Sequence, residues 1–140
     1  MLGGCLCGAI RYEAHEPFVS VSICHCRSCR LASGAPTVSW FVLPLTQFRW
    51  LKGQPTLFAS SPPVKRGFCA RCGTQLTYHH TDSPQEIEVT TLSLDEPGLV
   101  RPTREIWMSE RVGWVPVDMA LDHFSRENTQ GAPDHRGFGI

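Results

Sequence analysis

The chain has 140 residues, with 13 acidic side chains, 13 basic side chains and seven cysteines. This length is typical of one domain, and the balanced charge gives no net field that would attract nucleic acid or an anionic membrane surface. No apolar run reaches the roughly 18–20 residues of a membrane span, and no charged start precedes an apolar stretch as in a signal peptide. We therefore expect a cytoplasmic protein that binds neither nucleic acid nor membrane.

Short strands are expected along most of the chain, because runs rich in β-branched and aromatic residues alternate with turns rich in glycine and proline. A short helical turn is expected over residues 30–33, ended by Gly34 and Pro36. The expected strands cover residues 9–12, 19–23, 37–42, 48–51, 56–59, 65–68, 74–78, 86–92 and 103–108. The pattern predicts a mainly-β domain over residues 1–124 and a loosely ordered tail over residues 125–140.

The seven cysteines fall into three groups, at Cys5–Cys7, Cys24–Cys29 and Cys69–Cys72. Successive side chains of an extended chain face opposite ways, so the two thiols of a C-x-C run face the same side. An odd number of cysteines would leave one thiol over in a pure disulfide framework, and the cytoplasm keeps thiols reduced. Grouped thiols in that compartment indicate metal sites.

Spacing favours one closed zinc site and one open zinc site. Structural zinc is usually held by four ligands, whereas a catalytic site keeps one position for water or substrate. Cys5 and Cys7 form one pair of thiols and Cys69 and Cys72 another, and we call each pair a clip. The two clips predict a structural site, which would tie the start of the chain to its middle. Three further thiols remain as the candidate reactive site. The predicted structural ligands are Cys5, Cys7, Cys69 and Cys72, and the predicted catalytic ligands are Cys24, Cys26 and Cys29.

Other partitions of the ligands stay open at this point. Cys26 and Cys29 can instead join Cys69 and Cys72 in a ribbon-type site, or a single structural metal can coexist with scattered buried cysteines. A histidine can also complete the second site, and the candidates for that role are His25, His79 and His80. The simpler expectation is that His25 packs against its neighbours or meets solvent, that the histidine pair lies at a strand end, and that the remaining histidines are on the surface. These surface histidines are His15, His123 and His135.

Three thiolates around Zn²⁺ give a site of net negative charge and weak Lewis acidity, which activates water less well than a three-histidine site. Such a site suits a substrate sulfur, held as the fourth ligand in its nucleophilic thiolate form. Arg27 and Arg30 flank the cysteines and can offset their charge or bind a substrate carboxylate. Trp40, on the following strand, is expected near a pocket wall.

Three blocks of the sequence resemble the signature blocks of a known family. They are Gly4–Tyr12, Cys24–Arg30 and Phe68–Thr74, and all seven cysteines match in order and spacing. The family is that of the glutathione-dependent formaldehyde-activating enzymes (GFA), which also includes centromere protein V, and the resemblance covers about residues 1–120.

The resemblance implies a β-tent (Mss-four-like) fold of curved antiparallel sheets joined by a structural zinc. It implies two zinc ions per chain, with the same division of ligands that the spacing favours. It also implies a carbon–sulfur lyase that acts on S-hydroxymethylglutathione, with glutathione and formaldehyde as its small-molecule partners. One local departure is Glu105, which stands where many relatives carry a histidine.

Two hypotheses of function follow from these residues. In the first, the protein is an enzyme that acts on an adduct of glutathione, or another thiol, with formaldehyde or a small aldehyde. In the second, it is a non-catalytic zinc-binding module with two structural metals and a binding or chaperone-like role. The sequence leaves a homo-oligomer open under both hypotheses.

Overall fold

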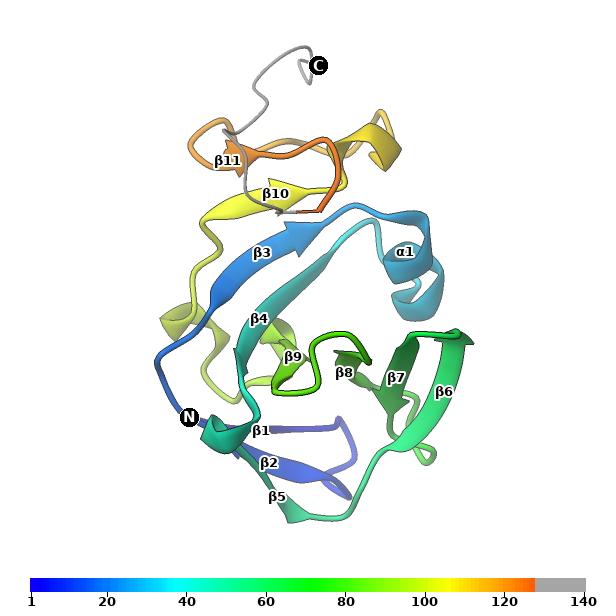
Figure 1. Ribbon diagram of the computed structural model, residues 1–140, viewed down its shortest axis with the longest axis vertical. Helices are drawn as coiled ribbons and strands as arrows, with labels where there is room; N and C mark the ends of the chain where they lie inside the picture. Colours follow the sequence, from blue (N-terminus) through cyan, green and yellow to red (C-terminus); the bar gives the residue numbers. More distant parts are fainter. Residues whose placement is uncertain (128–140) are drawn as a thin grey trace. The chain divides into compact units, whose positions relative to one another are not determined.

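The structure is a computed structural model that describes residues 1–127, and it is mainly β as the sequence predicts. The strands are β1 (Leu2–Gly4), β2 (Arg11–Ala14), β3 (Ser20–Cys24), β4 (Val38–Pro44), β5 (Phe48–Lys52), β6 (Thr56–Ser61), β7 (Val64–Phe68), β8 (Gln75–His80), β9 (Glu86–Thr90), β10 (Arg104–Ile106) and β11 (Asp122–His123) (Figure 1). The helices are α1 (Arg27–Ser33) and the 3₁₀ turns η1 (Leu45–Gln47), η2 (Thr91–Ser93), η3 (Pro97–Leu99) and η4 (Met108–Glu110).

Residue contacts divide the chain into two compact units. Unit 1 contains Met1–Ser20 and Phe41–Arg101, and unit 2 contains Val21–Trp40 and the described residues from Pro102 onward. Each unit is therefore built from segments that are distant in the sequence. Within residues 1–127, no helix combines the length and the apolar character needed to cross a membrane.

Unit 1 carries a three-stranded sheet in the order β1-β2-β5 and a run of antiparallel strands in the order β9-β8-β7-β6 (Figure 1). Tyr12 of β2 is fully buried and packs against Phe48 and Trp50 of β5, at ring-centroid distances of 5.3 and 6.1 Å. Burial of such large aromatic side chains is a principal source of stability in a small unit. The alternating burial of β2 is the pattern of a strand with one face on the core.

Unit 2 is organised around β3, which pairs in parallel with β10, while β10 pairs in parallel with β11. In this register Ile106 lies beside Cys24, so the end of β3 that carries this cysteine is paired with β10. Helix α1 follows β3 after one short turn and ends at Gly34, whose φ of 66° is the left-handed conformation common at helix ends. Strand β3 is therefore followed by helix α1 after only two residues.

Several strand boundaries differ from the predictions by one or two residues, and the helix is longer than predicted. It starts at Arg27 rather than residue 30, so Cys29 lies in its first turn. His123 was predicted on the surface, and this is wrong. It lies in β11 with 2% of its area exposed, and its ring donates from Nε2 to the Asp118 carbonyl at 2.9 Å. The predicted surface position of His15 is confirmed, and His135 lies outside the described residues.

The predicted boundary at residue 124 falls inside a hydrogen-bonded segment. Trp107 donates its amide to the carbonyl of Arg126 at 2.9 Å, and Ser109 donates to the carbonyl of Ser125 at 3.1 Å. The first residues of the predicted tail are thus bonded to unit 2. The rest of the predicted tail, residues 128–140, lies outside the described residues.

Candidate metal centres

The first thiol cluster joins the two clips of unit 1, and its four members are Cys5, Cys7, Cys69 and Cys72. Their sulfur atoms all lie within 4.8 Å of one another, and the Sγ–Sγ distances are 3.6 Å for Cys5–Cys7 and 3.8 Å for Cys7–Cys69. Tetrahedral Zn²⁺ with Zn–S bonds of about 2.3 Å places its sulfurs about 3.8 Å apart. The sulfurs are therefore spaced as a four-thiolate zinc site requires.

The N-terminal clip is shaped by a tight turn after β1. The amide of Cys5 donates to the Ile10 carbonyl at 3.1 Å, and the amide of Gly8 donates to the Cys5 carbonyl at 3.0 Å. Gly8 has a φ of 70°, a conformation that costs glycine least. The turn also directs the Ile10 amide at the Cys5 sulfur, with an N–S distance of 3.3 Å.

The second clip repeats this design between β7 and β8. The amide of Cys69 donates to the Thr74 carbonyl at 2.9 Å, and the amide of Gly73 donates to the Cys69 carbonyl at 2.8 Å. Gly73 has a φ of 76°. The two clips are linked directly, because the Leu6 amide donates to the Thr74 hydroxyl at 3.1 Å. Two backbone turns and one hydrogen bond to the Thr74 side chain thus bring four thiols together.

The pKa values of these thiols indicate that the cluster needs a cation to hold four thiolates. Hydrogen bonds from the hydroxyl and then the amide of Thr74 lower the pKa of Cys72 to about 5. The amide of Ala9 lowers the pKa of Cys7, but desolvation and the neighbouring thiols outweigh it and raise that pKa to about 11. Four thiolates cannot share this space without a cation between them. A divalent ion would supply that charge, so the donor set fits zinc.

The second thiol cluster lies in unit 2 and contains Cys24, Cys26 and Cys29, whose sulfurs also lie within 4.8 Å of one another. Cys24 ends β3 and Cys29 lies in the first turn of α1, and both are buried with 4% of their area exposed. Cys26 is the N-cap of α1 and accepts a hydrogen bond from the Cys29 amide at 3.3 Å. Hydrogen bonding to Cys26 and Cys29 and then burial raise the pKa of Cys24 well above its usual range. This set also needs a cation before it can ionise fully.

The described residues offer this cluster no fourth ligand from histidine, cysteine, aspartate or glutamate, since the group of close ligand atoms contains only the three thiols. His25 is 1% exposed, and its Nε2 atom lies 3.1 Å from Oε2 of Glu105. His79 and His80 end β8 in unit 1, as predicted for a strand end. The ribbon-type alternative is not the grouping observed, because Cys69 and Cys72 lie with the N-terminal clip.

The three predicted substrate-contact residues differ in their exposure and in their hydrogen bonds to the rest of the protein. Arg27 has an exposed side chain, and its amide donates to Oε2 of Glu110 at 2.6 Å. Arg30 donates from Nε to the His25 carbonyl and from Nη2 to the Glu110 carbonyl, both at 3.3 Å. Trp40 is 2% exposed, so its ring is part of the core of unit 2. The contact with Glu110 was not predicted from the sequence. Glu110 lies 83 residues after Arg27, and no sequence pattern links the two.

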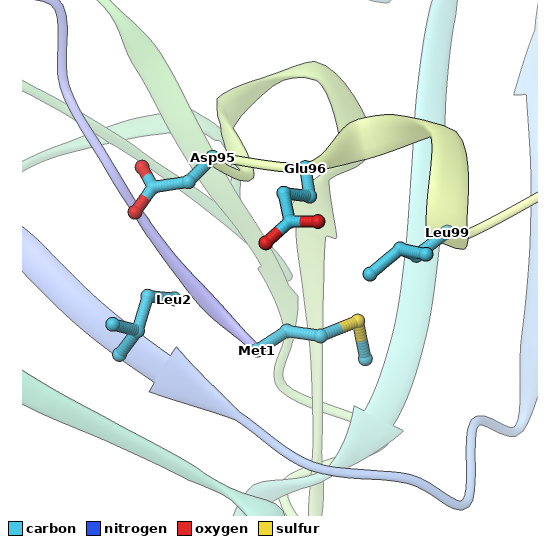
Figure 2. A pocket seen from close by; sticks show the side chains of 5 residues that line it. All are labelled: Met1, Leu2, Asp95, Glu96 and Leu99. Carbon is cyan, nitrogen blue, oxygen red and sulfur yellow. The ribbon is translucent and has the colours of Figure 1, made fainter.

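A pocket in unit 1 lies outside both thiol clusters. Figure 2 shows its lining, which consists of Met1, Leu2, Asp95, Glu96 and Leu99. The Asp95 carboxylate is paired with the guanidinium of Arg11. Without a thiol in its wall, this pocket is not a candidate for sulfur chemistry.

Comparison with known proteins identifies relatives of the chain. Residues 1–110 match the family described as "Glutathione-dependent formaldehyde-activating enzyme". An uncharacterized lyase of Schizosaccharomyces pombe is 33% identical over 82 residues, which are 57% of this chain and 58% of the relative. The chain thus spans little more than half the length of that curated relative.

A solved structure gives an independent comparison of the fold. The crystal structure of a Rhodobacter sphaeroides protein superimposes with a TM-score of 0.58 at 28% identity, and the match covers 73% of this chain and 92% of that protein. Together with the mainly-β sheets and the two cysteine clusters, this similarity confirms the predicted class of fold, the β-tent.

Proposed function

The chain belongs to the glutathione-dependent formaldehyde-activating enzyme family, and from this premise we propose that it is a zinc-dependent carbon–sulfur lyase. Its substrate is an adduct of glutathione, or of a similar thiol, with formaldehyde or another small aldehyde. In the forward direction the lyase releases the thiol and the aldehyde, and in reverse it joins them. The family and the lyase name of the S. pombe relative support this class of reaction.

The observation that carries the proposal is the three-thiol cluster, which finds no fourth protein ligand among residues 1–127. Zinc held by Cys24, Cys26 and Cys29 would supply a soft cation with a position for a substrate sulfur, and would favour the thiolate form of that sulfur. Cys24 and Cys29 are buried while Cys26 is half-buried. We assign the substrate side of the cluster to Cys26 and the start of α1.

The proposed reaction balances without an oxidant or reductant. In the cleavage direction the C–S bond of a hydroxymethyl thioether breaks and its electron pair stays on sulfur. The hydroxyl group loses its proton as the C=O bond of the aldehyde forms, and the released thiolate or the solvent takes that proton. A site that stabilises the negative charge developing on sulfur in the transition state therefore lowers the barrier in both directions.

Arg27 is the residue we propose for substrate binding next to the cluster. It directly follows Cys26, its side chain is exposed, and a guanidinium pairs well with the carboxylates that glutathione carries. Arg30 is proposed as a structural residue instead, because its guanidinium holds the carbonyls of His25 and Glu110. This separates two arginines that the sequence alone treats alike.

A turnover measurement with Cys29→Ser tests the proposal. Exchange between ¹³C-formaldehyde and S-hydroxymethylglutathione is followed by NMR in the presence of the zinc-loaded protein. The wild type should accelerate the exchange, whereas Cys29→Ser should lose at least about 100-fold of the acceleration, keep its fold and bind one zinc instead of two. Arg27→Gln should keep both zinc ions and raise KM for glutathione by about tenfold, as expected for loss of a charge-assisted hydrogen bond.

Equal exchange rates with the wild type, with Cys29→Ser and without protein would contradict the lyase proposal. In that case X-ray absorption at the zinc edge distinguishes the non-catalytic alternative. A closed shell of three sulfurs and one nitrogen, unchanged by added thiol, would indicate two structural metals.

A further inference from the structure

A buried histidine–glutamate contact lies beside the three-cysteine cluster, within unit 2. Glu105 of β10 is 2% exposed, and its Oε2 atom lies 3.1 Å from Nε2 of His25. Its other oxygen, Oε1, accepts a hydrogen bond from the Asp118 amide at 3.1 Å. Burial raises the pKa of Glu105, but the bonds from His25 and the Asp118 amide outweigh this and lower it. A buried carboxylate with both oxygens bonded is an ordered part of the structure.

His25, the partner of Glu105, is the residue between two of the candidate ligands. Its amide donates to the Ile106 carbonyl at 3.0 Å, and its carbonyl accepts from Nε of Arg30 at 3.3 Å. Its ring is held by Glu105. Amide, carbonyl and ring are all fixed, so the peptide segment that sets the directions of Cys24 and Cys26 has little freedom.

The support of Glu105 extends past the part of the chain that matches the family. His123 donates from Nε2 to the Asp118 carbonyl at 2.9 Å, and the Phe124 amide donates to the Glu105 carbonyl at 2.9 Å. The family match ends at residue 110, whereas these partners follow it. The network is therefore built partly from a segment that the family pattern does not describe.

We propose that Glu105 is a positioning residue for the three-cysteine metal site. Acting through His25, it fixes the backbone that directs the sulfurs of Cys24 and Cys26. The proposal rests on the proposed function in one respect, which is that this cluster holds a metal ion. It does not require that the metal acts on a glutathione adduct. Residues that orient metal ligands typically contribute about 10–100-fold to metal affinity.

Cobalt binding to the metal-free full-length chain tests this proposal, because thiolate-to-cobalt charge-transfer absorption reports coordination in each cluster. A chelator is titrated against the cobalt-loaded wild type and against Glu105→Gln, which keeps the size of the side chain and removes its charge. We expect Glu105→Gln to release cobalt from the three-cysteine site at about tenfold lower chelator concentration, with an altered charge-transfer band. The four-cysteine site should retain its affinity and serve as the internal reference.

Two further variants make the test specific. Glu13→Gln is the matched control, since Glu13 accepts from Arg49 at 2.7 Å in unit 1, and it should change neither site. His25→Phe should weaken the three-cysteine site as much as Glu105→Gln does, and combining the two should weaken it no further. If Glu105→Gln does not fold, His25→Phe alone provides the comparison with the wild type.

Three results would overturn the proposal: unchanged cobalt affinity and spectrum of the three-cysteine site, an equal loss of affinity at both sites, or a full additional loss in the double variant. The first would show no positioning role, the second a general loss of stability, and the third an effect that does not pass through His25. None of these readouts depends on thiol binding or turnover, so failure of the lyase proposal would be seen separately.

Discussion

Individual side chains of this protein ionise according to what surrounds them. Tyr12 is fully buried, and desolvation raises its pKa to about 12, although the hydrogen bond with Ser93 lowers it. Its hydroxyl lies 2.7 Å from that of Ser93. Cys72 shows the opposite case, since bonds from Thr74 lower its pKa. The local hydrogen bonds and the degree of burial decide the direction in both cases.

The raised pKa of Tyr12 predicts a loss of stability at alkaline pH. The unfolded chain ionises Tyr12 near its ordinary pKa of 10, whereas the folded chain does so near 12. The stabilising contribution is thus complete below pH 10 and is lost as the pH rises through 12. Over this range the wild type should lose about 2–3 kcal/mol of unfolding free energy relative to Tyr12→Phe. Urea unfolding of both proteins at several pH values measures the difference.

Tyr12→Phe is a suitable reference because the neighbouring hydroxyl of Ser93 keeps a hydrogen-bond partner. Ser93 still donates to the Thr90 carbonyl at 2.7 Å when the phenol is removed, so Tyr12→Phe leaves no hydroxyl unbonded. Parallel loss of stability in the two proteins between pH 10 and 12 would show that Tyr12 is not responsible.

At the scale of the elements, β1 illustrates how tightly unit 1 is packed around the N-terminal clip. Gly3 pairs with Tyr12 across the sheet, and a Cβ atom added at Gly3 would overlap the Tyr12 ring and lie 2.7 Å from the Ser93 carbonyl oxygen. The close approach of β1 to this aromatic side chain requires glycine. The strand leads directly to Cys5, so its position also sets that of the clip.

Gly3→Ala is therefore expected to destabilise the protein by about 1–3 kcal/mol, the usual cost of overpacking. Thermal unfolding of the zinc-loaded protein measures the effect. The matched control is Gly98→Ala in η3, where an added Cβ meets no atom within 4 Å. Equal melting temperatures for the two variants would contradict the packing argument.

At the scale of the whole molecule, the sequence predicted the grouping of all seven thiols, because C-x-C and C-x-x-C spacing already limits which sulfurs face the same side. It also predicted most strands, from alternation, β-branched and aromatic composition, and the turns between them. It did not predict the burial of His123 or the start of α1 at Arg27. The start of α1 is supported by Glu110, which is distant in sequence, and the burial of His123 accompanies a bond to the Asp118 carbonyl within a loop that has no periodic pattern. Trp40 was predicted near a pocket wall because it lies on the strand after the three-cysteine group; the structure shows that it is buried.

Each unit carries one thiol cluster. We propose different roles for them, one closed and one open to a substrate sulfur. The most direct test is a titration of the cobalt-loaded protein with glutathione, followed by thiolate-to-cobalt charge-transfer absorption. We expect two cobalt ions per chain and a saturable increase in absorption from a fourth thiolate at the three-cysteine site. The increase should be absent in Cys29→Ser and with S-methylglutathione. An unchanged spectrum in the wild type, or an equal increase in Cys29→Ser, would contradict this proposal.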